Sequence, residues 1–477
     1  MRFTRFHVSG VLLAFFAPLA AHAATTYYVA PTGSDAANGT ATGTPFATWG
    51  HAQSVAKPGD TVYFRAGKYT FTKGTTTCGN TASTIDGITL NVSGTAGNTI
   101  NYFAYPGEVP VIDFSGIKDQ CRVKGIDVTG SYIYLKGLEI MGTPQCPNPC
   151  QNHESWGIYV SNSHNTFELL NLHDNMGPGI YINSGGNNLV LNCDSHDNYD
   201  PYSWDRTNNV VTPGQNADGF GCHIGAGNTG NVFRGCRAWR NTDDGWDFIQ
   251  AQEVCTVENS WAWNMGQAMY QGAIVKPSAG NGNGFKGGGY GEPPTNVPAN
   301  PPSHVIQHCL SVGNKAAGFY ANHEPAADHW YNNTSYGNNP GFNLLGDPAN
   351  VGILRNNLAL SGTLLSNNTG NGIDESFNSW DTNLGVTVST ADFQGMNVSV
   401  TGLDAARQAD GSLPEVTNFH LVAGSDLIDK GTDVGLPFTG KAPDLGAFEY
   451  GATTSGAGGA GGAAGAGAGG AAGAGAG

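Results

Sequence analysis

Charged side chains are scarce in this sequence, and basic side chains are the scarcest. The 477 residues include 21 Lys and Arg against 37 Asp and Glu, which gives a formal net charge of −16. A protein that binds nucleic acid presents a basic face, so this composition argues against that function. The interior of the chain also lacks an apolar run of the roughly 18 residues that a membrane span requires, so we predict no membrane segment in the mature protein.

Glycine, by contrast, is abundant, with 71 residues. Each glycine inside a helix costs about 1 kcal/mol relative to alanine, so the composition disfavours a fold built from long helices. Hydrophobic residues make up 39% of the chain and aromatic residues 10%, which is enough for a large core.

The two ends of the chain differ in composition from the rest. A basic start, an apolar segment over 8–20 and a small-x-small site at 21–23 predict a secretory signal peptide over 1–23. Residues 451–477 are almost pure Gly and Ala, and we predict a disordered tail or linker there. We therefore expect a secreted, extracellular monomer with one domain over 24–450, and surface attachment through the tail stays open.

The nine cysteines are an odd number, and export permits disulfides. Cys146 and Cys150 bracket a Pro-rich turn and are candidates for a local pair, and Cys78 and Cys121 are candidates for a second. The spacing of a zinc site is absent. Three further cysteines lie five residues before the same Asn of a repeat and are expected to stack inside the fold: Cys193, Cys236 and Cys309.

That repeat has a period of about 23 residues. Aligned on an Asn that follows a short strand, it has spacings of 23, 43, 23, 50 and 24, and we interpret each long gap as two coils, one of them with an insertion. A Gly followed by an aromatic or aliphatic residue then opens the next strand. The aligned residues are Asn175, Asn198, Asn241, Asn264, Asn314 and Asn338, and the pairs begin at Gly179, Gly245, Gly318 and Gly341.

A fixed period of this length indicates a solenoid. The strands are short, β-branched or aromatic, and separated by Asn and Gly turns, while the leucine spacing of a leucine-rich repeat is missing. We therefore predict an all-β fold, a single parallel β-helix with three strands per coil. Residues 45–56 have helical spacing and are expected to cap its N-terminal end. Near the other end, Asp426, Asp429 and Asp444 are expected to cap turns.

Four aspartates lie close together in the segment 216–250. Asp243, Asp244 and Asp247 fall within five residues, and Asp218 lies 25 residues before Asp243, about one coil. One coil corresponds to one strand spacing, roughly 4.8 Å, so Asp218 is expected beside Asp243. Carboxylates at that range repel each other unless they are protonated or bind a cation. Because Ca²⁺ prefers several oxygen ligands, we predict a Ca²⁺ site, with turn capping as the alternative for any single Asp.

Lys286 follows Asp247 by 39 residues, less than two coils, and lies among glycines that leave it little shielded. Lys276 is the other candidate. For either lysine, the alternative of an ordinary solvent-exposed side chain without a catalytic role stays open. A nearby bound cation would lower the pKa of a lysine and free its amine as a base. A cation and a base without a Ser or Cys nucleophile suit removal of the C-5 proton of a uronic acid and loss of its C-4 glycosidic oxygen. This reaction is a β-elimination.

Three motifs in this order carry a family resemblance: NADGF, then NVFRGCRAW with RN-DDGWD, then NGFK with GG. They resemble the pectate lyases of polysaccharide lyase family 9, over roughly residues 25–450. The resemblance implies a right-handed parallel β-helix that cleaves α-1,4-linked polygalacturonan, the acidic polysaccharide of pectin. It also implies that Lys286 is the catalytic base, in preference to Lys276. The implied Ca²⁺ ligands are Asp218, Asp243, Asp244 and Asp247, with a backbone carbonyl near Ala217.

The sequence does not determine which residues contact the substrate, and several alternative functions also stay open. Arg237 and Arg240 flank a repeat strand and are candidates to bind substrate carboxylates or to pair with acidic neighbours; the other candidates are His223, Arg206 and Lys315. A lyase or epimerase acting on another uronic-acid polymer is one alternative function. An inverting polygalacturonase is another, although its G-H-G and R-I-K motifs are absent. The last is a non-catalytic β-helical protein that binds glycans at the cell surface, for which Lys286 would be dispensable.

Overall fold

The computed structural model describes residues 22–75, 84–119, 121–146, 154–205, 208–267, 269–270, 273–274, 279–291, 294–344, 352–366, 373–395, 400 and 402–452. Most of the predicted signal peptide and of the predicted tail lies outside these residues. So do Lys276, Arg206, Cys78 and Cys150. Within the described part, no helix is long and apolar enough to cross a membrane.

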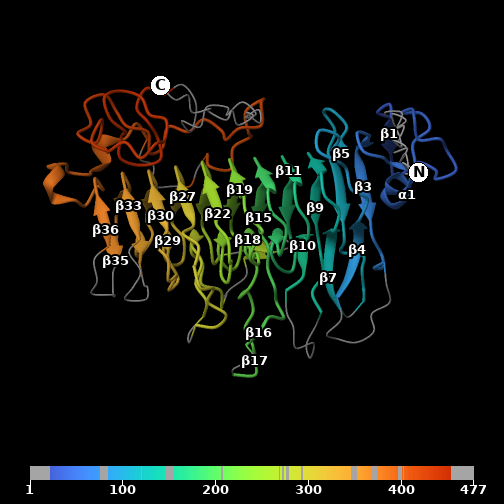
Figure 1. The fold of residues 1–477 in the computed structure, drawn as a ribbon, viewed down its shortest axis with the longest axis horizontal. Helices are drawn as coiled ribbons and strands as arrows, with labels where there is room; N and C mark the ends of the chain where they lie inside the picture. Colours follow the sequence, from blue (N-terminus) through green and yellow to red (C-terminus); the bar gives the residue numbers. More distant parts are fainter. Residues whose placement is uncertain are drawn as a thin grey trace, which may run out of the picture.

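Three parallel sheets, here named A, B and C, contain most of the strands (Figure 1). Sheet A consists, in order, of β1 (Thr26–Val29), β2 (Thr61–Phe64), β5 (Ile100–Ala104), β8 (Ile133–Lys136), β11 (Thr166–Glu168), β14 (Leu189–Leu191), β19 (Asn231–Arg234), β22 (Cys255–Glu258), β27 (Val305–Gln307), β30 (His329–Tyr331), β33 (Ile353–Arg355) and β36 (Asp374–Ser376). Sheet B consists of β3 (Gly67–Thr70), β6 (Pro110–Asp113), β9 (Glu139–Met141), β12 (Asn171–His173), β15 (Asp194–His196), β20 (Arg237–Trp239), β23 (Trp261–Trp263), β28 (Leu310–Val312), β31 (Thr334–Tyr336) and β34 (Leu358–Leu360). Sheet C consists of β4 (Thr84–Leu90), β7 (Arg122–Val128), β10 (Trp156–Val160), β13 (Ile180–Ile182), β18 (Phe220–Cys222), β21 (Trp246–Asp247), β26 (Phe285–Lys286), β29 (Phe319–Tyr320), β32 (Phe342–Asn343) and β35 (Leu365–Ser366).

The remaining elements are short. Two antiparallel hairpins stand outside the three sheets: β16 (Trp204–Asp205) with β17 (Val210–Val211), and β24 (Met269–Tyr270) with β25 (Ala273–Ile274). The helices are α1 (Trp49–Val55) and the 3-10 turns η1 (Thr382–Leu384) and η2 (Thr390–Asp392). The predicted N-terminal cap is therefore present as α1, whose start is capped by the Thr48 hydroxyl accepting a hydrogen bond from the His51 N–H.

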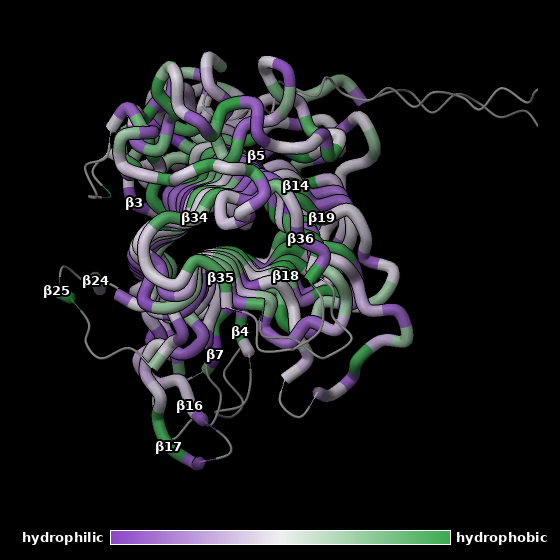
Figure 2. Tube along the Cα trace, turned by 90° about the vertical axis from the view of Figure 1, so that its left-hand side faces the viewer, coloured by the Kyte–Doolittle hydropathy of each residue, from purple (hydrophilic) through white to green (hydrophobic). Residues whose placement is uncertain are grey.

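The chain visits sheets C, A and B in turn, so each circuit is one coil of a parallel β-helix (Figure 2). This confirms the predicted all-β solenoid. Five of the six aligned Asn residues are buried at the turn after sheet B. Asn264 is the exception: it is half-buried, and Met265 holds the equivalent position and donates its backbone N–H to Asn314, so the alignment was wrong there. At this turn the amide oxygen of an Asn accepts a backbone N–H from the coil before. Asn198 accepts from Asn175, Asn241 from Asn198, and Asn338 from Asn314. The backbone N–H groups of these buried turns are therefore hydrogen-bonded to the repeat Asn side chains.

The interpretation of the two long repeat gaps was wrong. Strand β15 pairs directly with β20, and β23 pairs directly with β28, so each gap is a single coil with an inserted loop. The hairpins β16–β17 and β24–β25 lie in these insertions. Surface loops can lengthen at little entropic cost. The spacing between two repeat Asn residues therefore does not determine how many coils lie between them.

The interior is lined by aromatic and aliphatic side chains. Phe220, Trp246, Phe285, Phe319 and Phe342 occupy one inward row of sheet C and stack with ring centroids 4.7–5.1 Å apart. A second row holds the three cysteines that we predicted to be internal: Cys193, Cys236 and Cys309 are buried and free. A disulfide joins Cys222 to Cys255, which the sequence analysis did not predict. Cys121 and Cys146 are also disulfide-bonded.

The outer faces of the sheets are not equivalent. The segment 402–450 runs along the outer face of sheet B, on the upper side in Figure 1. Arg237 of β20 fixes it by donating from Nη1 to the carbonyl oxygens of Leu403 and Ala405, at 2.9 and 2.8 Å. Asp429 and Asp444 accept backbone N–H bonds from Lys441 and Tyr450 within the segment. Asp426 instead accepts the Thr387 N–H from outside it, so the predicted turn cap is not found at Asp426. Sheet C, on the opposite side, carries the predicted aspartates and Lys286.

Candidate active site

Two of the aspartates occupy equivalent positions in successive coils. Asp218 and Asp244 each lie two residues before the inward aromatic residue that opens a sheet C strand, and Asn283 holds the same position before β26. The three form a column in which each Oδ1 accepts a backbone N–H from the next coil. Asp218 accepts from Asp244 at 3.1 Å, and Asp244 accepts from Asn283 at 2.7 Å. The register therefore places Asp218 beside Asp244, and not beside Asp243 as we expected.

Asp247 and Lys286 are direct neighbours on the outer face of sheet C. Strand β21 pairs with β26 so that Asp247 lies opposite Lys286, one coil apart. Trp246 and Phe285, which precede them, point into the core, and alternation along a strand turns Asp247 and Lys286 outward. The Lys286 Nζ lies 2.9 Å from the Asp247 Oδ2 and 3.3 Å from the Asp244 Oδ2.

Three carboxylates converge on one point. Asp218, Asp244 and Asp247 each offer an oxygen atom that lies within 4.8 Å of the other two. Asp243 is not one of these three, and its Oδ1 accepts the Asn281 N–H at 2.7 Å; its role as a fourth Ca²⁺ ligand stays a prediction. The Asp244 Oδ2 accepts no hydrogen bond from the described residues. Hard oxygen donors at this spacing, one of them without a hydrogen bond, fit a Ca²⁺ ion.

The electrostatics of the cluster favour a bound cation. Burial and the neighbouring carboxylates raise the pKa of Asp218 and of Asp243 well above the usual range. Burial alone would lower the pKa of Lys286, but the surrounding carboxylates outweigh it and hold the pKa well above its usual value. Lys286 is thus the counter-ion of a cluster that carries more negative charge than one ammonium neutralises.

His223 and Lys315 lie close to the cluster. His223 follows β18, its ring centroid is 4.7 Å from that of Tyr181, and its Nε2 is buried without a hydrogen-bond partner among the described residues. Burial lowers the pKa of His223, with Asp247 and Lys286 as its charged neighbours. Lys315 donates from Nζ to the carbonyl oxygen of Gly280, in the segment that contacts Asp243.

The two arginines have other contacts. Arg237 is buried on the outer face of sheet B, where it donates to both oxygens of Asp194 and to the segment 402–450. Arg240 binds both oxygens of Asp197 through Nε and Nη2, at 2.7 and 2.6 Å. These contacts are those of structural ion pairs.

Comparisons with known proteins assign the chain to a family. Residues 27–369 match the family model described as Pel9A-like, right-handed beta helix region. The chain is 38% identical to pectate lyase L of Dickeya chrysanthemi over 432 residues, which cover 89% of this chain and 90% of that protein. The chain belongs to the Pel9A-like β-helix family. The predicted family and enzyme class, a polysaccharide lyase, are confirmed at this level.

Two solved structures of similar fold match most of the chain. The crystal structure of pectate lyase Pel9A is 34% identical, has a TM-score of 0.72, and the match covers 89% of this chain and 96% of that chain. A structure described as a rhamnogalacturonan lyase is 32% identical, has a TM-score of 0.70, and the match covers 84% of this chain and 97% of that chain. The right-handed β-helix of the Pel9A-like family confirms the predicted handedness.

Asn283 is the site residue that the sequence analysis missed. Its Nδ2 donates to the Asp244 Oδ1 at 2.9 Å, and its own Oδ1 accepts the Ala317 N–H at 3.0 Å, which fixes the orientation of the amide. Alignment of the Gly-aromatic pairs, instead of the repeat Asn residues, would have found it. That alignment places Asp218, Asp244 and Asn283 at the same position.

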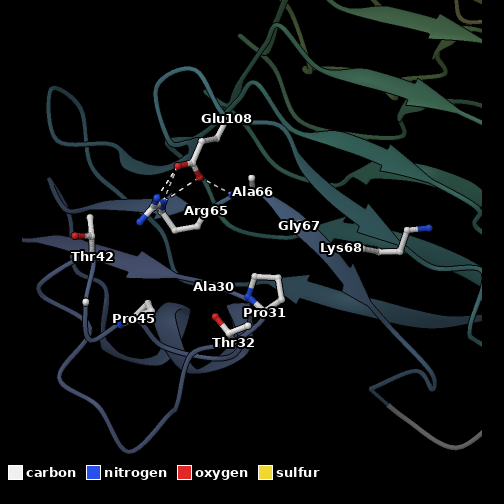
Figure 3. Close-up of a pocket in the computed structure, with 11 residues that line it drawn as sticks. Ala30, Pro31, Thr32, Thr42, Pro45, Arg65, Ala66, Gly67, Lys68 and Glu108 are labelled. Carbon is white, nitrogen blue, oxygen red and sulfur yellow. Dashed lines mark hydrogen bonds and ion pairs between the residues drawn. The ribbon is translucent and has the colours of Figure 1, made fainter.

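The described pockets lie elsewhere. One of about 550 Å³ is found at the N-terminal end, where Arg65, Glu108 and Lys68 are among its lining residues (Figure 3). Arg65 is held there by both oxygens of Glu108. This pocket is remote from the trio and carries none of the residues that we assign to the site.

Proposed function

We propose that this protein is a secreted Ca²⁺-dependent pectate lyase, which cleaves α-1,4-linked polygalacturonan by β-elimination. The observation that carries the proposal is the position of Lys286, in contact with Asp244 and Asp247 on the outer face of sheet C. The similar proteins named pectate lyase support the choice of substrate.

In this mechanism Asp218, Asp244 and Asp247 would hold Ca²⁺, which when bound would supply the positive charge that acidifies the proton beside a uronate carboxylate. Lys286 is the base. Once a cation offsets the charge of the carboxylates, the pKa of Lys286 falls, and its Nζ accepts the C-5 proton. The electron pair of the C-5–H bond forms the C-4=C-5 double bond, and the C-4 glycosidic oxygen leaves with its electrons. Activity should therefore rise toward alkaline pH as Lys286 loses its proton.

The test is the ultraviolet absorbance of a polygalacturonate solution after addition of the purified protein. An absorbance that rises with Ca²⁺, and does not rise with a chelator, is the expected result, because each elimination creates an unsaturated uronate end. Lys286→Met should abolish the signal, whereas Lys136→Met, on sheet A, should retain it. Full activity in chelator would contradict the metal assignment, and new reducing ends without absorbance would indicate a hydrolase.

A second candidate is a lyase that acts on another acidic polymer. It is favoured by the similarity to the structure described as a rhamnogalacturonan lyase. The same absorbance assay with rhamnogalacturonan separates the two, because a higher kcat/KM on that polymer would replace polygalacturonan as the substrate.

A further inference from the structure

One row of side chains on the outer face of sheet C leads away from Lys286 toward the N-terminal end. The strand register places Asp127, Tyr159, Tyr181, Gly221 and Asp247 opposite one another in β7, β10, β13, β18 and β21. The row continues with Lys286 in β26. It is therefore the same outward row that contains the proposed base, in contrast to the face of sheet B, which the segment 402–450 occupies.

Two tyrosines of this row present hydroxyl groups without protein partners. Tyr159 and Tyr181 are half-buried, and their rings stack with centroids 5.5 Å apart. Neither hydroxyl has a hydrogen-bond partner among the residues that the structure describes. Gly221 leaves room for the Tyr181 ring, since a Cβ there would lie 2.8 Å from Tyr181 Cδ2. The ring consequently leans toward Asp247 and Lys286.

A lysine lies at the far end of the tyrosine pair. The Lys124 Nζ sits 4.1 Å from the centre of the Tyr159 ring and 3.0 Å from the Asp127 Oδ2. Its side chain is 19% exposed. An ammonium has three N–H donors, so the pair with Asp127 leaves donors for an incoming carboxylate. In a chain with few basic residues, this cation on the face of the proposed active site is a notable local feature.

We infer that Lys124, Tyr159 and Tyr181 form a distal subsite, which binds the uronate units of an acidic polysaccharide that extends beyond the bond being cleaved. The inference rests on the proposed function. Strands in a sheet lie roughly 4.8 Å apart, so the strands that carry Tyr181, Tyr159 and Lys124 lie roughly 14, 19 and 24 Å from the strand of Lys286. A long polymer reaches the subsite, whereas a short oligomer bound at Lys286 does not. The subsite therefore favours long chains.

Burial keeps the two tyrosine hydroxyls protonated, and so able to donate hydrogen bonds, at the alkaline pH at which Lys286 would act as a base. It raises the pKa of Tyr159 to about 12 and raises that of Tyr181 further. Their hydroxyls stay protonated there, and a hydroxyl or ammonium bonded to a carboxylate is a strong, charge-assisted contact.

Lys124→Ala provides the test, with Lys136→Ala as the matched control. Lys136 belongs to the same coil but to sheet A, where it pairs with Glu168 at 3.0 Å. We expect Lys124→Ala to raise the KM for long polygalacturonate about tenfold, the effect of losing one hydrogen bond to a charged group, with kcat unchanged. The kcat/KM for trigalacturonate should remain at the wild-type value, and Lys136→Ala should match the wild type on both substrates. Tyr159→Phe with Tyr181→Phe retains the ring stack and should also raise KM for the long polymer alone.

Circular dichroism and thermal unfolding of each variant separate binding effects from misfolding. Equal KM values for Lys124→Ala and Lys136→Ala on the long polymer would overturn the subsite, as would an equal loss by Lys124→Ala on trigalacturonate. If the wild type cleaves no uronan, the proposed function fails and the subsite fails with it. If the wild type prefers long chains and both the Lys124 variant and the double Phe variant retain that preference, only the subsite fails.

Discussion

At the scale of single residues, the two oxygens of Asp244 have separate roles. Oδ1 accepts both the backbone N–H and the side-chain N–H of Asn283, at 2.7 and 2.9 Å. Oδ2 accepts no hydrogen bond from the described chain and lies 3.3 Å from the Lys286 ammonium. The amide thus fixes which oxygen faces the trio. Partners that orient a metal ligand in this way contribute to metal affinity although they do not touch the metal.

We therefore predict that Asn283→Ala weakens Ca²⁺ binding by about 10- to 100-fold, because Asp244 loses the group that orients it. Titration calorimetry with Ca²⁺ alone measures this without any substrate. Asn338→Ala is the control, since it also removes a buried amide, one that donates to Ser311 and Ser335 and not to a carboxylate of the trio. The control should lower stability and leave Ca²⁺ affinity intact. Equal affinities in the two variants would contradict the role of Asn283.

The aspartates could be chosen from the sequence because their type and spacing suggest a cation site, whereas Lys286 was preferred to Lys276 only through the family resemblance. The exact pairing of the aspartates could not be predicted, since Asp243 and Asp244 both lie about one coil after Asp218 and only the strand register decides between them. The length between Asp247 and Lys286 was unclear for another reason, because it includes the β24–β25 insertion. Asn283 was missed for a related reason. An Asn in a Gly-rich turn has the composition of any other turn, and only its place in the column distinguishes it.

At the scale of elements, sheet B is fixed to the C-terminal segment by a shared carboxylate. Arg237 and Arg407 both donate to Asp194, with Nη2 to oxygen distances of 2.6 Å, and Arg237 also reaches the carbonyl oxygens of Leu403 and Ala405. Arg237 is 4% exposed, so its removal leaves buried acceptors without their donors.

Arg237→Ala should accordingly lower the free energy of unfolding by about 3 kcal/mol, the low end for a broken buried pair because Arg407 still binds Asp194. Urea denaturation measures this change, and KM for polygalacturonate should not move. Arg234→Ala removes a pair with Glu258 in which the arginine side chain is 45% exposed, and should cost less than about 1 kcal/mol. A raised KM with unchanged stability would instead support the substrate contact that the sequence left open for Arg237.

The repeat predicted the positions of turns and strand starts better than it predicted the number of coils. The repeat Asn residues identify the turn after sheet B, where their amide oxygens accept backbone N–H groups of the coil before. Similar Asn columns lie at other turns, as at Asn188 and Asn231. The Gly-aromatic pairs likewise identify the starts of sheet C strands, as at β21 and β29. Inserted loops have no such sequence signal. The loops that contain β16–β17 and β24–β25 are each about as long as one coil, so the sequence predicted an additional coil in each gap.

At the scale of the whole molecule, negative charge dominates, and the proposed substrate is also negative. A net charge of −16 repels a polyanion, so binding depends on where the few cations lie. Lys286 and Lys124 are both on the face of sheet C, while Arg237 and Arg407 are engaged by the C-terminal segment. The β-helix thus separates its faces: sheet B is used for packing, and sheet C is available for the polymer.

The stability of the whole β-helix should fall at alkaline pH, and His173 provides one cause. Burial alone would lower its pKa, but hydrogen bonds to Asp174 and Glu139, at 3.0 and 3.2 Å, outweigh burial and raise the pKa to about 9. The pKa in the unfolded chain is near 6.5, so this stabilisation is complete below about pH 6.5 and is lost as the pH rises through about 9. A pKa that is higher by one in the folded protein corresponds to about 1.4 kcal/mol, so the stability lost is on the order of 3 kcal/mol.

Urea unfolding of the wild type and of His173→Gln at pH 6 and pH 10 tests this prediction. Glutamine retains the hydrogen-bonding capacity of the position and carries no charge, so the variant should be less stable than the wild type at pH 6 and close to it at pH 10. A constant difference between the two proteins across this range would show that His173 does not gain its proton on folding. If the difference does shrink as predicted, the alkaline optimum expected for Lys286 falls where the β-helix has already lost part of its stability, and the upper limit of activity would be set by unfolding and not by the base.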